Sequence, residues 1–184
     1  MPIPEFLDED PGSTALSSIP ETHGPRTLVL GLGNDILTDD AVGLWIARQL
    51  RQEFLGIPFI EVRETCEMGL ALLDHLAGFQ QAFIVDSIQT GKADSGVLHE
   101  LDPSTLARLA GPTPHFVGVG EVLALGQQLG LEMPRRVRVF AVEVADPFSL
   151  GTRLSRSVEE ALPAILDHIR AAVLLACGVP NPPN

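Results

Sequence analysis

The sequence predicts an α/β fold, a three-layer domain in which helices cover both faces of a twisted, largely parallel, five-stranded sheet. Two observations carry this prediction. Short apolar runs, which are typical of strands buried on both faces, alternate along the chain with longer segments whose apolar residues repeat at helical spacing. Residues 27–50 also read as an unbroken strand, glycine turn and helix, which is the first half of a βαβ unit. Each crossover between parallel strands is therefore expected to be right-handed.

The first unit places two carboxylates at one edge of the sheet. Residues 28–30 are continuously apolar and predict a buried strand, which Gly31 and Gly33 end. Asp39 and Asp40 then open a helix, where the helix dipole favours acidic side chains. The apolar residues of this helix recur at helical spacing: Val42, Trp45, Ile46 and Leu50. The aspartates therefore lie at the carboxyl edge, where open α/β folds bind ligands.

The later elements follow the same alternation. Strands are expected at residues 59–64, 82–85, 97–101 and 136–144, and helices at residues 68–77, 117–129 and about 157–177. The strand over 82–85 is expected to end at Asp86, and the strand over 97–101 to lie at an edge or run antiparallel. Ser157 and Glu160 fit a capping box for the last helix, in which Pro163 predicts a kink.

One folded domain is expected between two tails. Residues 1–25 contain five acidic residues and no Lys or Arg, and their composition predicts a flexible acidic extension. Residues 26–177 form the predicted α/β domain, which is long enough to bury a sizeable core. Residues 178–184 form a Pro-rich tail.

The composition excludes some partners and indicates a compartment. A net charge of −12 over 184 residues opposes binding to nucleic acid or to an anionic membrane. The first residues lack the basic and apolar regions of a signal peptide, and no apolar run approaches the roughly 18 residues of a membrane span. Cys66 and Cys177 form no CxxC pair. We therefore expect a cytoplasmic protein with reduced thiols and no membrane insertion.

Three candidate ligands lie where a strand or a breaker segment meets the next element: Asp40, Asp86 and His115. In a doubly wound sheet the junctions after the first and third strands share an edge, so these side chains can be neighbours. Two carboxylates beside an imidazole would need a divalent cation or shared protons to offset their repulsion. A mixed oxygen and nitrogen set with open positions suits nickel or zinc better than calcium or magnesium.

Each candidate also has a structural interpretation. Asp39 and Asp40 fit an N-cap and a helix-dipole partner, and Asp86 fits the cap of a following turn. His115 fits a partly buried histidine bonded to backbone. Other chemistries are less favoured, because Ile36 replaces the third glycine of a dinucleotide fingerprint and no GxSxG motif is present.

Four motifs, taken in order, resemble the nickel-iron hydrogenase maturation endopeptidases. They are Gly-Leu-Gly-Asn at 31–34, Asp-Asp-Ala-Val-Gly at 39–43, Ile-Val-Asp at 84–86 and Pro-His at 114–115. The similarity extends from about Thr27 to Leu175. Members of this family remove a short C-terminal extension from the hydrogenase large subunit after nickel insertion. The resemblance implies the same function here, with the large-subunit precursor as partner, and we expect the chain itself to be a monomer.

The resemblance also assigns roles to individual residues. Asp40 and Asp86 match the family's two acidic ligands and His115 its imidazole ligand, so these three are the expected catalytic and metal-binding groups. The metal is nickel supplied by the precursor, with zinc or another divalent cation as an alternative in the same site. Glu64 matches a further acidic position and, with Asp39, is a candidate substrate-loop residue.

The implied activity is that of an aspartyl-type endopeptidase that cleaves only after nickel insertion. The cation would polarise the scissile carbonyl or activate a water, with one carboxylate as base. The family commonly has a Gly-Gly-Thr or Gly-Thr type turn where this chain reads Thr65-Cys66-Glu67, which is expected to alter how this loop contacts a substrate. Two alternatives to this function remain. One is a nickel-checking chaperone that does not cut the precursor, and the other is another peptidase or hydrolase on the same scaffold.

Overall fold

A five-stranded sheet forms the centre of the computed structural model, which describes residues 24–101 and 119–180. The strands are β1 (Thr27–Leu32), β2 (Ile60–Thr65), β3 (Gln81–Ile88), β4 (Leu98–Leu101) and β5 (Arg136–Glu143). Their order across the sheet is β2-β1-β3-β5-β4. β1 pairs in parallel with β2 and β3, and β3 with β5, whereas the edge strand β4 runs antiparallel to β5. The predicted largely parallel α/β sheet is therefore confirmed.

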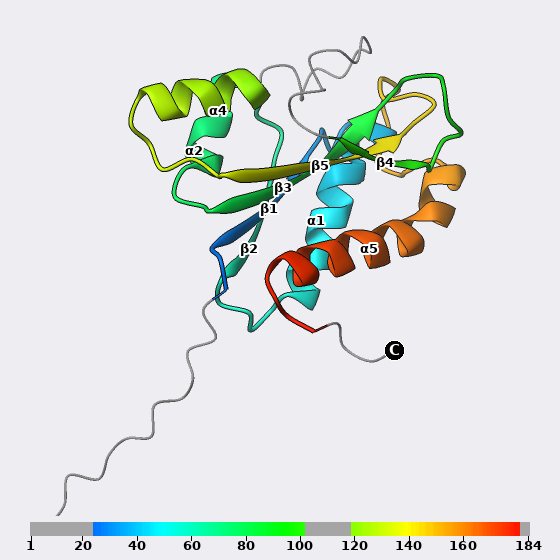
Figure 1. Ribbon diagram of the computed structural model, residues 1–184. Coiled ribbons are helices and arrows are strands. Elements are labelled where there is room, and N and C mark those ends of the chain that lie inside the picture. The colour runs from blue at the N-terminus through cyan, green and yellow to red at the C-terminus, as the bar shows by residue number, and fades with distance from the viewer. Residues whose placement is uncertain (1–23, 102–118, 181–184) are drawn as a thin grey trace, which may run out of the picture.

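Helices cover both faces of this sheet, giving the three predicted layers (Figure 1). One face carries α1 (Val42–Glu53) and α5 (Arg156–Ala176), and the other carries α2 (Leu72–Leu76) and α4 (Val119–Gln128). Single 3-10 turns precede α1 and α2, at Asp39–Ala41 and Gly69–Ala71.

Successive residues of the central strands serve opposite layers, because side chains alternate across a strand. Val29 of β1 packs in the core under α1 and α5. Leu28 and Leu30 of the same strand pack in the second core, under α2 and α4. All six residues of β1 and all eight of β3 are buried, as the continuous apolar runs of the sequence indicated.

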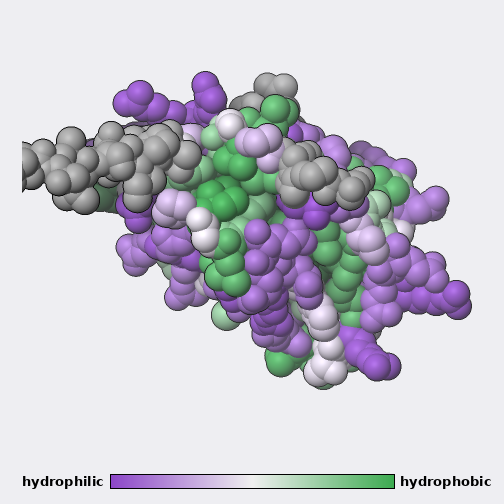
Figure 2. Space-filling model, turned by 90° about the horizontal axis from the view of Figure 1, so that it is seen from below, coloured by the Kyte–Doolittle hydropathy of each residue, from purple (hydrophilic) through white to green (hydrophobic). Residues whose placement is uncertain are grey.

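The side of the molecule on which α5 lies is largely hydrophilic. Figure 2 shows this side from below, with hydrophobic areas separated by hydrophilic side chains. Trp45, which the helical spacing placed among the apolar residues of α1, is 37% exposed, while Val42, Ile46 and Leu50 are fully buried. Within the described parts of the chain, no helix has both the length and the apolar character needed to cross a membrane.

Two local predictions are wrong. β3 does not end at Asp86 but continues to Ile88, because β5 extends alongside it and pairs Asp86 with Ala141. The last helix begins at Arg156 rather than through a capping box at Ser157, and its N-cap residue, Ser155, makes no side-chain capping hydrogen bond. The predicted antiparallel edge strand over 97–101 is confirmed by β4.

Candidate active site

Asp40 and Asp86 meet at one serine at the carboxyl edge of the sheet. The backbone N–H of Ser87 donates to Asp86 Oδ1 at 2.7 Å, and its Oγ donates to Asp40 Oδ1 at 3.0 Å. The three residues are 3%, 0% and 4% exposed for Ser87, Asp86 and Asp40 respectively. Ser87 therefore fixes the orientation of two buried carboxylates that are 46 positions apart in the chain.

Glycines allow the helix that carries Asp40 to approach the strand ends. A Cβ atom on Gly43 would lie 2.2 Å from the Leu32 carbonyl oxygen and 2.4 Å from the Val85 carbonyl oxygen. A Cβ on Gly33 would lie 2.1 Å from the Asp40 carbonyl oxygen. Both distances are far below normal contact, so only glycine lets α1 begin directly against β1 and β3.

Asp39 connects this edge to the start of α5. Its Oδ1 accepts a 2.6 Å hydrogen bond from the backbone N–H of Ser155, and the carboxylate is 2% exposed. Asp39 makes no capping bond to its own helical turn, whose N-cap residue is Thr38. The sequence interpretation of Asp39 as an N-cap is therefore wrong, and the residue instead joins two segments that follow β1 and β5.

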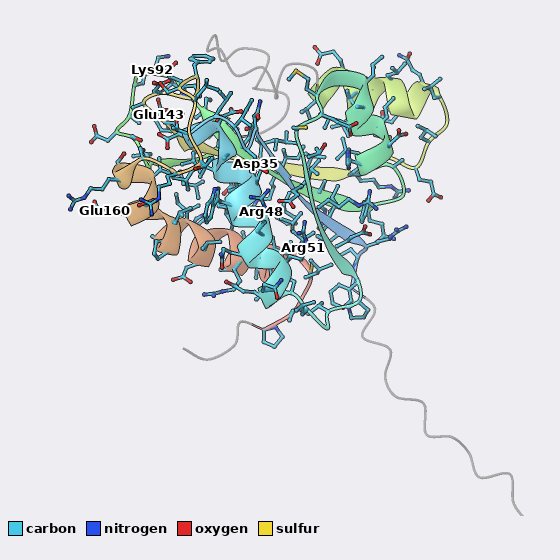
Figure 3. The ribbon with its side chains drawn as sticks, turned by 180° about the vertical axis from the view of Figure 1, so that it is seen from behind. Asp35, Arg48, Arg51, Lys92, Glu143 and Glu160 are labelled. Carbon is cyan, nitrogen blue, oxygen red and sulfur yellow. The ribbon has the colours of Figure 1, made fainter. Side chains whose placement is uncertain are left out.

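Glu64, the candidate substrate-loop residue at the end of β2, carries its own counter-charges. Arg48 Nε donates to Glu64 Oε2 at 2.7 Å, and Arg51 Nη1 lies 3.6 Å from Glu64 Oε1. Arg48 also donates to Asp35 at 2.7 Å, and Figure 3 shows Arg48 and Arg51 along α1 with Asp35 beyond its first turn. The hydrogen bond to Asp35 and the nearby charge of Glu64, opposed by burial, raise the pKa of Arg48 above its ordinary value. Glu64 is therefore held by α1.

The Thr65-Cys66-Glu67 loop is ordered by its own side chains. Thr65 Oγ1 accepts from the backbone N–H of Glu67 at 3.0 Å, and Glu67 Oε2 lies 3.0 Å from His75 Nε2. Cys66 is exposed. The departure from the family turn thus gives a polar loop anchored to α2.

Glu143 is a buried carboxylate that sequence reasoning missed. It lies at the end of β5, is 1% exposed, and accepts hydrogen bonds from Thr90 N–H (2.8 Å), Thr90 Oγ1 (2.7 Å) and Gly91 N–H (2.9 Å). His99 Nε2 lies 2.9 Å from Glu143 Oε2, the oxygen that also accepts from the Thr90 hydroxyl. Burial raises the pKa of Glu143, but the hydrogen bonds from Thr90, Gly91 and His99 outweigh burial, so this pKa lies below its ordinary value. The available signal was a single acid within an apolar run, Ala141-Val142-Glu143-Val144.

The third predicted ligand, His115, lies outside the described residues. Within residues 24–101 and 119–180, no group of three His, Cys, Asp or Glu side chains could hold a metal ion. Asp40 and Asp86 are thus the members of the predicted set that the structure brings to one place, through Ser87.

The fold and these contacts define an α/β domain with paired buried aspartates at the carboxyl edge of a mostly parallel sheet. No protein-family model matches the chain. The chain is 28% identical over 150 residues to the hydrogenase 2 maturation protease of Escherichia coli strain K12. The aligned region covers 80% of this chain and 90% of that relative. The resemblance that the sequence motifs indicated is thereby confirmed.

Solved structures give the same result. The hydrogenase maturating endopeptidase HybD from E. coli superposes with a TM-score of 0.70 at 29% identity, over 80% of this chain and 91% of that chain. The hydrogenase 2 maturation peptidase from Thaumarchaeota archaeon SCGC_AB-539-E09 has a TM-score of 0.56 at 25% identity, over 80% and 97% of the two chains. The described domain therefore has the fold of hydrogenase maturation proteases.

Proposed function

We propose that this chain is a hydrogenase maturation endopeptidase that removes the C-terminal extension of a nickel-iron hydrogenase large-subunit precursor after nickel insertion. The observation that carries the proposal is the pairing of Asp40 and Asp86 at Ser87, in a fold shared with the E. coli endopeptidase at a TM-score of 0.70. The same two aspartates were selected from the sequence by their places after the first and third strands.

The buried carboxylates can act as bases toward a water at the scissile carbonyl. Asp40 and Asp86 are at most 4% exposed, and low exposure strengthens their electrostatic interactions with a charged group. Ser87 keeps both carboxylates oriented, so neither has to reorganise when the substrate arrives. Because both proposed bases are aspartates, we assign the proposed activity to the aspartyl-type class.

Nickel in the precursor is the substrate feature that this site would recognise. Asp40 and Asp86 supply oxygen donors of the kind that hold divalent cations, with His115 as the proposed nitrogen donor and zinc as the alternative metal. When bound, the cation would polarise the scissile carbonyl or lower the pKa of a water. Cleavage then depends on nickel insertion, because two carboxylates alone do not complete the ligand set. We propose that the protein performs this reaction in the cytoplasm as a monomer.

The test is cleavage of purified large-subunit precursor, with and without nickel, followed by mass spectrometry. Asp86→Asn keeps the shape of the side chain and is expected to lower kcat by about 100-fold or more, in the range that a general base contributes. Asp167→Asn is the matched control, because Asp167 is an exposed aspartate on α5 that forms a surface ion pair with Arg170, and such pairs contribute little to stability. Normal processing by Asp86→Asn would exclude the proposed site.

The same assay separates the alternatives. A nickel-checking chaperone would bind the nickel-containing precursor without changing its mass. A peptidase or hydrolase of another specificity would leave the precursor intact and unbound.

A further inference from the structure

The loops that follow β1 and β5 pair with each other beyond the sheet. Leu37 and Leu150 form an antiparallel β-bridge, the Thr38 N–H donates to the Ser149 carbonyl at 2.9 Å, and the Gly151 N–H donates to the Ile36 carbonyl at 3.1 Å. We name residues 36–38 and 148–151 the edge ribbon. Figure 1 shows its two halves side by side, the blue loop after β1 against the yellow-orange loop after β5. Because β3 lies between β1 and β5 in the sheet, the ribbon joins the two loops that flank the strand of Asp86.

The edge ribbon exposes three large apolar side chains. Ile36 is 62% exposed, Phe148 is 57% exposed and Leu150 is 79% exposed. Exposed apolar side chains that gather beside a site of charged groups mark binding surfaces more often than scattered ones do. These three occupy two short segments that backbone hydrogen bonds join, so they lie close together in the fold.

The ribbon is held in a fixed conformation without a ligand. Asp146 accepts from the backbone N–H groups of Phe148 (2.8 Å) and Ser149 (3.1 Å) and from the Ser149 hydroxyl. These hydrogen bonds lower the pKa of Asp146, so the anchor is ionised at neutral pH. Thr38 Oγ1 donates to the Asp146 carbonyl at 3.3 Å, which ties the second loop to the same anchor. A preorganised surface loses less conformational entropy when a partner binds.

The ribbon is continuous with the proposed active site. Thr38 is followed directly by the buried pair Asp39 and Asp40, and the far end of the second loop returns to Asp39 through the Ser155 N–H. Residues 33–40 and 144–155 together carry four acidic residues and one basic residue, Arg153; of the acids, Asp35 is paired with Arg48, and Asp39 and Asp40 are buried. A segment bound here meets apolar side chains and then a negatively charged site.

We propose that the edge ribbon binds the cleavable C-terminal segment of the precursor, as an extended peptide whose apolar side chains face the ribbon. The inference rests on the proposed function and deepens it, because it assigns substrate selection to Ile36, Phe148 and Leu150. The apolar side chains of the peptide pack on these three residues. The scissile bond is thereby brought to Asp40 and Asp86.

The experiment measures cleavage and binding separately, with the nickel-containing large-subunit precursor as probe. Phe148→Ser and Leu150→Ser are each expected to raise KM about tenfold with little change in kcat, since each removes one anchoring apolar contact. Leu150→Met retains an apolar side chain and is expected to keep KM within about twofold. Leu129→Ser and Leu175→Ser are the matched controls, because these leucines are 62% and 81% exposed and lie outside the ribbon. Leu129 directly follows α4, and Leu175 lies on α5.

Binding is measured in an Asp86→Asn background, in which cleavage is expected to be slowed by about 100-fold or more. Weaker binding of the Phe148→Ser and Leu150→Ser forms, with unchanged binding of the control forms, supports the edge ribbon whether or not cleavage occurs. Equal effects of ribbon and control substitutions, or ribbon effects confined to kcat, would overturn the inference and leave the proposed function standing. A wild-type chain that neither binds nor cleaves the precursor would refute both. Circular dichroism of each variant confirms that it is folded.

Discussion

Replacing Gly43 by alanine tests whether close approach of α1 to the strand ends builds the site. The added Cβ would meet the Leu32 and Val85 carbonyl oxygens at 2.2 and 2.4 Å, so α1 must retreat by about 1 Å to restore normal contact. Overpacking against backbone that cannot rotate away costs about 3 kcal/mol. Alanine in place of glycine inside a helix returns about 1 kcal/mol. We therefore expect the free energy of unfolding to fall by about 2 kcal/mol.

Gly126→Ala in α4 is the matched control for Gly43→Ala. It brings the same gain in helix propensity, but its Cβ would meet Met133 Sδ at 2.5 Å, at the end of a flexible side chain that can move. Urea unfolding followed by circular dichroism measures both variants, and precursor cleavage measures the site. Gly43→Ala should lose stability and activity together, because its retreat displaces Asp40 from Ser87. A Gly43→Ala protein as stable and active as Gly126→Ala would refute this account of how the site is formed.

Three further predictions concern buried polar groups and the two thiols. Glu143→Gln is expected to lower the free energy of unfolding by about 2 kcal/mol at pH 7, since it removes a charge that accepts several hydrogen bonds. The pKa of Glu143 is lower in the folded protein than its ordinary value of 4.5, so the charged form stabilises the fold above pH 4.5. This contribution is lost as pH falls through the folded pKa. The stability difference between Glu143→Gln and wild type should therefore shrink in unfolding curves measured below about pH 4.5. A difference that grows in acid would contradict this sign. Ser87→Ala should lower the free energy of unfolding, measured in urea, by about 1 kcal/mol and should slow precursor cleavage. The substitution removes the hydrogen bond to Asp40 and keeps the backbone hydrogen bond to Asp86. Unchanged cleavage would show that the Ser87 hydroxyl does not orient Asp40. The exposed Cys66 should react at once with a disulfide reagent at about pH 8, whereas the buried Cys177 should react only as the protein unfolds. Burial raises the pKa of Cys177 despite its hydrogen bonds with Thr27 and Gln81. Equal reaction rates would contradict the burial of Cys177.

The layer arrangement could be predicted because the strands are buried on both faces. Residues 28–30 and 82–85 are continuously apolar, with no alternation of polar residues, as expected of strands buried between two helical layers. Both segments lie in central strands, β1 and β3. Strand ends were less predictable. Asp86 looks like a strand end in the sequence, but the Ser87 N–H donates to its Oδ1, and pairing with β5 continues the strand to Ile88.

The candidate site could be predicted only as far as topology determines it. The places of Asp40 and Asp86 follow from parallel strand order, which puts the ends of β1 and β3 side by side. The roles of Ser87 and Glu143 could not be assigned, because they depend on contacts with residues far away in the chain. Ser87 bonds to Asp40, 47 positions away, and the contacts of Glu143 lie 44 to 53 positions away. The role of His115 as a ligand stays a prediction, since this residue lies outside the described parts of the chain.

The bond from the Ser155 N–H to Asp39 limits how this protein can change its preference for a substrate. It closes the segments after β1 and β5 into a ring, with the β-bridge of Leu37 and Leu150 as a second closure. An insertion in either segment would pull on Asp39 and shift the neighbouring Asp40. Exchange of single outward-pointing side chains leaves the ring intact, so new specificity can be engineered there by point substitution and not by grafting longer loops.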